Sequence, residues 1–274
     1  MTQPSIFRTW IPTPTHSAHV TVKYYDSTGT ASCTKPVDTI PSLASHGIWV
    51  PSETCLPVGW VGGAVVTSSD YPIVAVGRPH VGAEVMTYDG FSSGSLTSYL
   101  PMLFKNAWGS YDSGFYIQNV DSTPGHSAHV TVTYYASTGA VSCTKPVDVI
   151  PPLASHGIWV PGESCLPAGW VGGAVVSSSD YPIVAVGRLH VGAQVTTYDG
   201  FTGGSTTMSL PMLFKNMWGS YDSAFYIQNT DSGGPASVTI SFYDVNGNLN
   251  CTRRDSIPAL ATLGYWVPSI TCSP

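Results

Sequence analysis

The sequence predicts an all-β protein made of tandem antiparallel β-sandwich units, each holding one internal disulfide. Three observations predict it. The sequence repeats with a period of 110 residues, its apolar residues alternate over short segments, and its cysteines fall in one pair per copy. Repeats of this kind indicate an array of similar units rather than one large domain.

The repeat defines the units. Shifting the chain by 110 positions lays residues 16–119 over 126–229, and 84 of those 104 positions are identical. A third, more diverged copy follows, in which VTISFY at 238–243 answers VTVTYY at 130–135. The predicted organisation is therefore an N-terminal extension and three units, the last incomplete: 1–15, 16–99, 100–209 and 210–274.

Each unit contains a segment that alternates as a half-buried strand does. Val20, Val22 and Tyr24 share one face, and the matching face in the third copy stays large and apolar, ending at Phe242. Because Phe242 has no hydroxyl, we infer that the core uses the ring at this position. Further short Val-rich segments follow, bounded by turn residues, and about seven strands per unit is typical of a β-sandwich.

The six cysteines recur at spacings of 22, 22 and 21 residues, one pair to each copy. Zinc sites need close pairs such as C-x2-C, which are missing here. We predict disulfides inside each unit, worth about 3 kcal/mol apiece in the chain-entropy model and typical of oxidising compartments. An extracellular or cell-surface location follows. The predicted pairs are Cys33–Cys55, Cys143–Cys165 and Cys251–Cys272.

The content of charged and apolar residues limits which partners the chain is expected to bind. Charged residues form 9% of the chain, against about 25% in typical proteins, and the formal net charge is −6. The ten Lys and Arg are scattered, so the basic footprint that holds a phosphate backbone is missing and nucleic acid is not an expected partner. No apolar run reaches the roughly 18 residues of a membrane span, so we do not expect one.

Residues 100–119 return almost unchanged at 210–229 and mark the join between units. They begin apolar, break at residues 106–113 and end in an alternating strand pattern. We expect their large side chains to pack where consecutive units meet, which would stiffen the array. The residues assigned to this packing are Leu100, Phe104, Trp108, Leu210, Phe214 and Trp218.

The sequence offers no catalytic or metal constellation. His16 and His19 lie three apart, which on a strand places them on opposite faces, and the third copy lacks both. Asp26-Ser-Thr-Gly29 faintly resembles an aspartic-protease motif, but Ala136 replaces the acid in the second copy, which favours a hairpin turn. We expect no enzyme activity, no metal and no cofactor.

Aromatic residues are the remaining candidates for binding. Stacked rings could bind sugars, although large aromatics more often form cores and contacts between units. The candidates are Trp49, Trp60, Trp108, Tyr111, Tyr116 and their copies. Asn250-Cys-Thr252 matches the N-glycosylation pattern, and the Ser/Thr-rich surface could carry O-linked sugar.

Four runs in order carry a resemblance: FYIQN at 115–119, VTVTYYASTG at 130–139, LPAGWVGGAVV at 166–176 and SDYPIVAVG at 179–187. They resemble the tandem Ig-like repeats of secreted bacterial surface proteins, especially those of filamentous mat-forming bacteria. The resemblance implies Ig-like sandwiches strung along an extracellular or cell-surface fibre, without enzyme activity. The paired cysteines and the two incomplete ends depart from the commoner form of such repeats.

The ends suggest a mode of assembly. Half a sandwich exposes a core face and strand edges that template association. We expect a fibre subunit that polymerises head to tail by strand complementation, its third unit packing against the N-terminal part of the next chain. The residues assigned to that contact are Ile6, Phe7, Trp10 and Ile11. Two alternatives stay open: the chain is a window of a longer covalent array, or it is a carbohydrate-binding or adhesion module of a larger surface protein.

Overall fold

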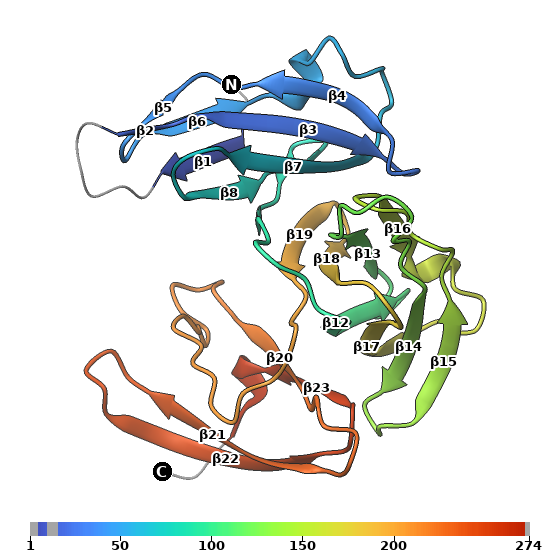
Figure 1. Ribbon diagram of the computed structural model, residues 1–274. Coiled ribbons are helices and arrows are strands. Elements are labelled where there is room, and N and C mark those ends of the chain that lie inside the picture. The colour runs from blue at the N-terminus through green and yellow to red at the C-terminus, as the bar shows by residue number, and fades with distance from the viewer. Residues whose placement is uncertain (1–4, 10–15, 272–274) are drawn as a thin grey trace.

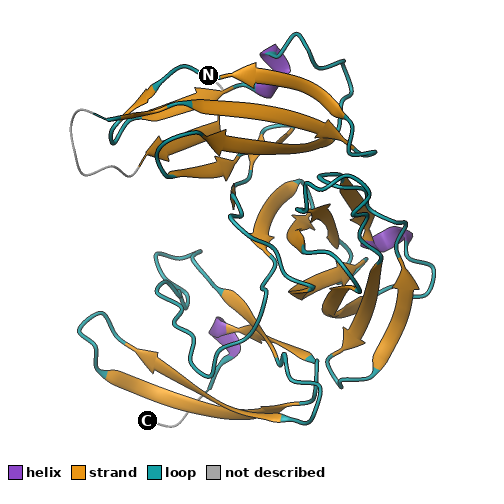
Figure 2. Cartoon of the chain, in the orientation of Figure 1, coloured by secondary structure: helices purple, strands orange, loops and turns teal. Residues whose placement is uncertain are grey.

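The computed structural model describes residues 5–9 and 16–271, and it is an all-β protein. Across these residues every strand pair is antiparallel, and three short 3-10 helices complete the regular structure (Figures 1 and 2). In the described part of the chain, no helix is long and apolar enough to cross a membrane. The strands fall into three successive groups along the chain, which we describe as the first, second and third units.

The second unit is a sandwich of two four-stranded sheets. The first sheet has the order β12-β17-β14-β15, and the second has the order β16-β13-β18-β19. The eight strands are β12 (Thr97–Lys105), β13 (Tyr111–Asn119), β14 (Val130–Ala136), β15 (Val141–Pro146), β16 (Ser155–Trp159), β17 (Trp170–Ser178), β18 (Ile183–Val191) and β19 (Gln194–Asp199).

The core of the second unit lies between these sheets and follows the alternation of the sequence. Val130, Val132 and Tyr134 of β14 are buried, while the residues between them reach the surface. Leu100 of β12 and Phe115 of β13 join the same cluster. The face that the sequence identifies as apolar in all three copies is therefore the face that builds the core.

The first unit has the same plan with a three-stranded sheet, β4-β3-β7, opposite a four-stranded sheet, β11-β8-β1-β6. Two small ladders, β2–β5 and β9–β10, accompany them. The strands are β1 (Ser5–Thr9), β2 (Ser17–Ala18), β3 (Val20–Asp26), β4 (Ala31–Pro36), β5 (Ile40–Pro41), β6 (Ser45–Ile48), β7 (Gly62–Ser68), β8 (Ile73–Gly77), β9 (His80–Val81), β10 (Glu84–Val85) and β11 (Tyr88–Asp89).

Strand β1 corrects the expectation that residues 1–15 are an extension reserved for another chain. It pairs with β6 and β8 of its own unit. Phe7 stands opposite Ala75, as Ile117 of β13 stands opposite Ala185, 110 residues later. Ile6 and Phe7 therefore belong to a strand of the first unit, and this strand continues the period. Trp10 and Ile11 lie outside the described residues.

The third unit contains two antiparallel pairs, the hairpin β21–β22 and the pair β20–β23 that flanks it in the sequence. These strands are β20 (Ala224–Gln228), β21 (Ala236–Tyr243), β22 (Leu249–Ile257) and β23 (Thr262–Trp266). Residues 207–215, the copy of β12, form no strand here. The described part of this unit has no counterpart of β17, the strand that pairs with β12, so the copied segment has nothing to pair with.

Disulfides form inside the first two units as the spacing predicts. Cys33 is bonded to Cys55 and Cys143 to Cys165, with Cα atoms 5.8 and 5.9 Å apart. The third predicted pair includes Cys272, which lies outside the described residues.

A substitution at Tyr134 tests whether the core is stabilised by the ring or by the hydroxyl at this position. Its side chain is fully buried, and its hydroxyl makes no hydrogen bond to the described residues. Burial raises the pKa of the phenol. An unpaired buried hydroxyl costs stability, about 1–3 kcal/mol by mutational measures. We expect Tyr134→Phe, which installs the residue found at Phe242, to leave the free energy of unfolding unchanged or to raise it by about 1 kcal/mol.

Tyr198→Phe is the matched control, measured by the same urea titration. The Tyr198 hydroxyl donates a 2.7 Å hydrogen bond to the carbonyl oxygen of Met102. Its loss leaves that carbonyl without the bond and should cost about 1 kcal/mol. Equal losses of unfolding free energy in Tyr134→Phe and Tyr198→Phe would show that the Tyr134 hydroxyl also stabilises the core. That result would contradict the assignment of the ring as the stabilising group.

Candidate functional site

The most distinctive feature of the molecule is the joint between consecutive units, because the chain makes it twice in the same way. A hairpin tip, the turn between the strands β3 and β4 or β14 and β15, meets a turn of the next unit. Gly29 of the first tip lies against Pro151 and Pro152, and Gly139 of the second tip lies against Pro258 and Ala259. We call the receiving segments, together with their counterpart in the first unit, the proline turns: residues 41–43, 151–153 and 258–260.

Glycine is required at these tips for two reasons. The backbone φ angles are +76° at Gly29 and +81° at Gly139, in the region that side chains disfavour. A Cβ atom at Gly139 would also stand 2.9 Å from Cβ of Pro258 and 3.0 Å from the carbonyl oxygen of Ala259. The tip therefore approaches its neighbour with backbone rather than with a side chain.

A second repeated contact lies beside the first. Gly63 of β7 faces Gln118 and Ser155 of the second unit, with room for no side chain. Gly173 of β17 likewise faces Gln228 and Thr262 of the third unit. The joint is thus built from the same positions in both places. Its signal in the sequence is a Gly-Gly pair that recurs in two copies, which strand alternation alone does not explain.

The joint of the first two units also has polar contacts. The Thr197 hydroxyl donates to the carbonyl oxygen of Thr87 at 2.6 Å, and the Asp89 backbone N–H donates to the carboxylate of Asp199. Burial raises the pKa of Asp199 above its ordinary value. Each pair joins residues one period apart, so neighbouring units meet there through equivalent strands.

Phe104 is the predicted joint residue that the structure places in the joint. Its ring is 1% exposed and lies 5.7 Å from the ring of Tyr226 in the third unit. Leu100, by contrast, is buried in the core of the second unit. In the third unit Leu210 is exposed and Phe214 half-buried, because residues 210–215 pair with no strand of the described chain.

Trp108 and Trp218 correct the prediction that they are buried between units. Their side chains are 67% and 72% exposed. Each sits in a turn with a positive φ, +46° at Trp108, which turns the ring outward. The Trp108 ring meets Tyr111 edge to face at 5.1 Å, and Trp218 meets Tyr221 in the same way at 5.3 Å. We call each pair an aromatic corner.

The other aromatic candidates divide between core and surface. The ring of Trp60 packs edge to face on Tyr24, and its indole N–H donates to Ser32. Trp49 is half-buried beside His80. Tyr116 is 41% exposed, and its ring covers Gly157, where any side chain would collide with it.

The histidines serve local contacts. His19 and His129 each hydrogen-bond an aspartate, Asp70 and Asp180, through the ring and the backbone N–H. The hydrogen bond from the His19 ring lowers the pKa of Asp70 to about 2. His16 stacks on Tyr71 at 4.8 Å. Among the described residues, no group of three or more potential metal ligands comes together.

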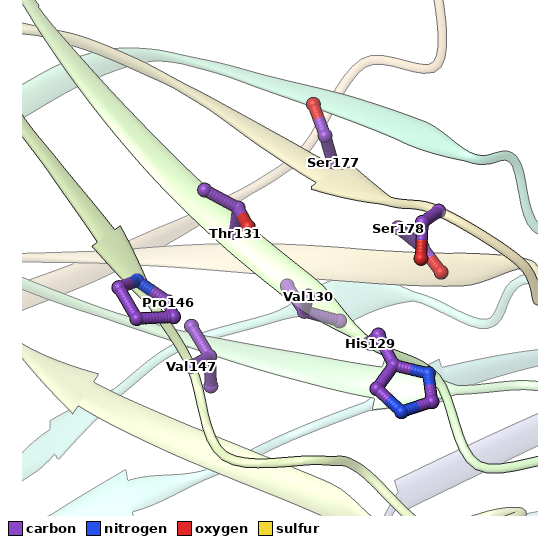
Figure 3. A pocket seen from close by; sticks show the side chains of 8 residues that line it. His129, Val130, Thr131, Pro146, Val147, Ser177 and Ser178 are labelled. Atoms are coloured by element: carbon purple, nitrogen blue, oxygen red, sulfur yellow. The ribbon is translucent and has the colours of Figure 1, made fainter.

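Two hollows occur in the second unit. One, of about 310 Å³, is an open depression along β14 and the ends of its neighbours, lined by His129, Thr131, Pro146 and Ser177 among others (Figure 3). The second, of about 240 Å³, lies beside Tyr134 and the buried carboxylate of Glu163. Lys145 pairs with that carboxylate at 2.8 Å. This ion pair satisfies the buried charge.

Asn250, the candidate glycosylation site, is exposed at a bulge in β22, where the register against β21 shifts. Its side chain faces solvent. Glycosylation at this position stays a prediction.

The chain shows little similarity to known proteins. No family model matches the chain, and no curated protein matches it. Among solved structures, the Thermotoga maritima protein described as Thermotoga maritima 1070 aligns with 40% of this chain and 96% of its own, at 16% identity and a TM-score of 0.33. A likeness this weak carries no argument about function.

Proposed function

We propose that the chain is a non-catalytic structural protein of the cell exterior, the subunit of a surface fibre that grows head to tail. The observation that supports the proposal is the joint, which the chain builds twice from equivalent positions. A contact between two different surfaces of a repeating unit is head to tail, and its repetition gives an open filament wherever the rotation between units does not close a ring.

Open strand edges provide the second support. In the second unit β17 pairs with both β14 and β12, whereas β7, its copy in the first unit, pairs among the described residues with β3 alone. β21 pairs with β22 alone in the same part of the chain. Such edges accept strands from other chains, and strand complementation between molecules would use them.

The cell exterior suits the covalent chemistry and the surface. The two disulfides described here persist in oxidising compartments. A chain with 9% charged residues has little charge repulsion to keep its copies apart, which suits assembly into a fibre.

Sedimentation velocity and negative-stain electron microscopy of the purified chain test the proposal. We expect a concentration-dependent ladder of species and filaments with a repeat set by the chain. A single species of 28.9 kDa at all concentrations, with no filaments, would overturn the fibre assignment.

The aromatic corners favour a second candidate function, a carbohydrate-binding or adhesion module. Exposed Trp rings present flat apolar faces that stack on sugars, and the corners recur one period apart in two units. An array of equivalent weak sites gains strength through multivalency.

Retention on insoluble polysaccharides tests this function. We expect Trp108→Ala with Trp218→Ala to weaken binding by roughly tenfold or more, which corresponds to about 1.4 kcal/mol. Met208→Ala, at another exposed apolar side chain, is the control and should bind as the parent does. If the double variant binds the polysaccharide as the parent does, the aromatic corners are not the binding sites.

A further inference from the structure

The three proline turns are chemically alike but unequally covered. Leu43 of the first unit is 69% exposed, whereas Leu153 and Leu260 at the same place in the second and third units are half-buried. The alanine that follows shows the same order, since Ala44 is half-buried and Ala154 is fully buried. The difference arises because a preceding unit packs on the second and third turns, whereas among the described residues no preceding unit packs on Leu43 of the first.

The three hairpin tips show the complementary pattern. Gly29 and Gly139 are half-buried against a proline turn, whereas Gly247 of the third tip is exposed, and nothing lies near the position its Cβ would take. Val245 in the same tip is 101% exposed. The backbone is nevertheless the same, since the φ angle of Gly247 is +83°. The third tip is therefore shaped for a contact that the described chain itself does not make.

We propose that the hairpin tip of the third unit, residues 244–248, seats on the proline turn of the first unit of a second copy, residues 41–43. The contact repeats between molecules the one that Gly29 and Gly139 make inside each molecule. This inference rests on the proposed head-to-tail fibre and names the two surfaces that meet. Strand complementation can accompany it but is not needed for it.

The two surfaces fit each other chemically. The glycine of the tip presents backbone to a turn that has no charged residue, and the carboxylate of Asp244 in the tip is already hydrogen-bonded within the tip itself. The tip is already held by its own unit, because the backbone N–H groups of Asn246 and Asn248 donate to the carboxylate of Asp244. A tip fixed in this way loses little conformational freedom on binding.

Site-specific photo-crosslinking of the full chain tests the proposal. A benzophenone amino acid is placed at Asn246 in one sample and at Thr138, its counterpart in the second tip, in another. Thr138 should crosslink within the chain to residues 258–260, which calibrates the method. Asn246 should give species at multiples of the chain mass, with the crosslink mapped to residues 41–43.

A second variant probes the receiving turn. Leu43→Glu adds a carboxylate to the turn that would receive a tip carrying Asp244, and it should reduce the intermolecular crosslink at least fivefold because like charges repel and the apolar contact is lost. Leu43 is exposed, so the unit should stay folded, as circular dichroism will show. Val58→Glu adds the same charge at another exposed site of the first unit and should leave the crosslink yield unchanged.

The outcomes separate this inference from the proposed function. Filaments whose Asn246 crosslinks map elsewhere, or that persist with an unchanged crosslink yield in Leu43→Glu, overturn the tip-on-turn contact and leave the fibre standing. A chain that neither sediments as oligomers nor crosslinks between molecules overturns both.

Discussion

Replacing Phe104 with alanine is expected to lower the free energy of unfolding of the second unit by about 3–5 kcal/mol, the usual cost of removing a buried phenylalanine. The ring is 1% exposed and packs with Ala107 and Leu189 of its own unit. It also lies 5.7 Å from Tyr226 across the joint. The cavity left behind therefore opens both the edge of the sandwich and the contact with the third unit.

Urea unfolding of the full chain measures the loss, and energy transfer between dyes on the second and third units measures the joint. Trp108→Ala is the control, because its exposed ring should cost less than about 1 kcal/mol. A double-mutant cycle with Tyr226→Ala isolates the ring pair, for which we expect a coupling of about 0.5–1.5 kcal/mol. Equal losses for Phe104→Ala and Trp108→Ala would show that the exposed tryptophan carries the joint after all.

The contrast between Phe104 and Trp108 shows what the sequence can and cannot predict here. Both are large apolar residues in one segment, so composition favours burial for both. The turn decides otherwise, because Asn106 and Trp108 both take positive φ angles, +48° and +46°. Gly109 in the sequence predicts a turn. The direction of the Trp108 side chain, however, depends on the backbone of the two strands that the turn joins, β12 and β13.

Strand alternation and the recurrence of cysteines were sufficient to predict the core and the disulfides within a unit. Periodicity places Val130, Val132 and Tyr134 in one core, and recurrence pairs the cysteines of the first two units as the structure has them. Both signals are local to one unit, which is why a single sequence shows them.

Strand β1 and the joints could not be found from sequence identity. MTQPSIFRT at 1–9 shares no residue with YDSGFYIQN at 111–119, yet Ser5–Thr9 takes the same place and register as the matching part of β13. Only the constant offset of 110 would have indicated it. The joints depend on glycines and prolines whose role is to let backbones approach, and the recurring Gly-Gly pair marks such a position without showing which segment approaches it.

Removal of the disulfide of the second unit, by Cys143→Ala with Cys165→Ala, is expected to cost about 3 kcal/mol. In the chain-entropy model, the cost depends on the length of the loop that the bond closes in the unfolded state. Cys33 and Cys55 close a loop with the same sequence separation of 22 residues. The corresponding double variant of the first unit should therefore lose the same amount.

Calorimetry of the two variants and the parent chain measures these losses unit by unit. Each variant should lower the transition midpoint of its own unit by roughly 12–24 °C, because about 1 kcal/mol moves the midpoint by roughly 4–8 °C in a domain of this size. A loss much smaller in the first unit would contradict loop entropy as the dominant effect. Such a result would mean that the native first unit is less ordered than the second, so that its Cys33–Cys55 disulfide contributes less to stability. That outcome is expected if the open edge of β7 needs a strand from a neighbouring chain before the first unit is fully ordered.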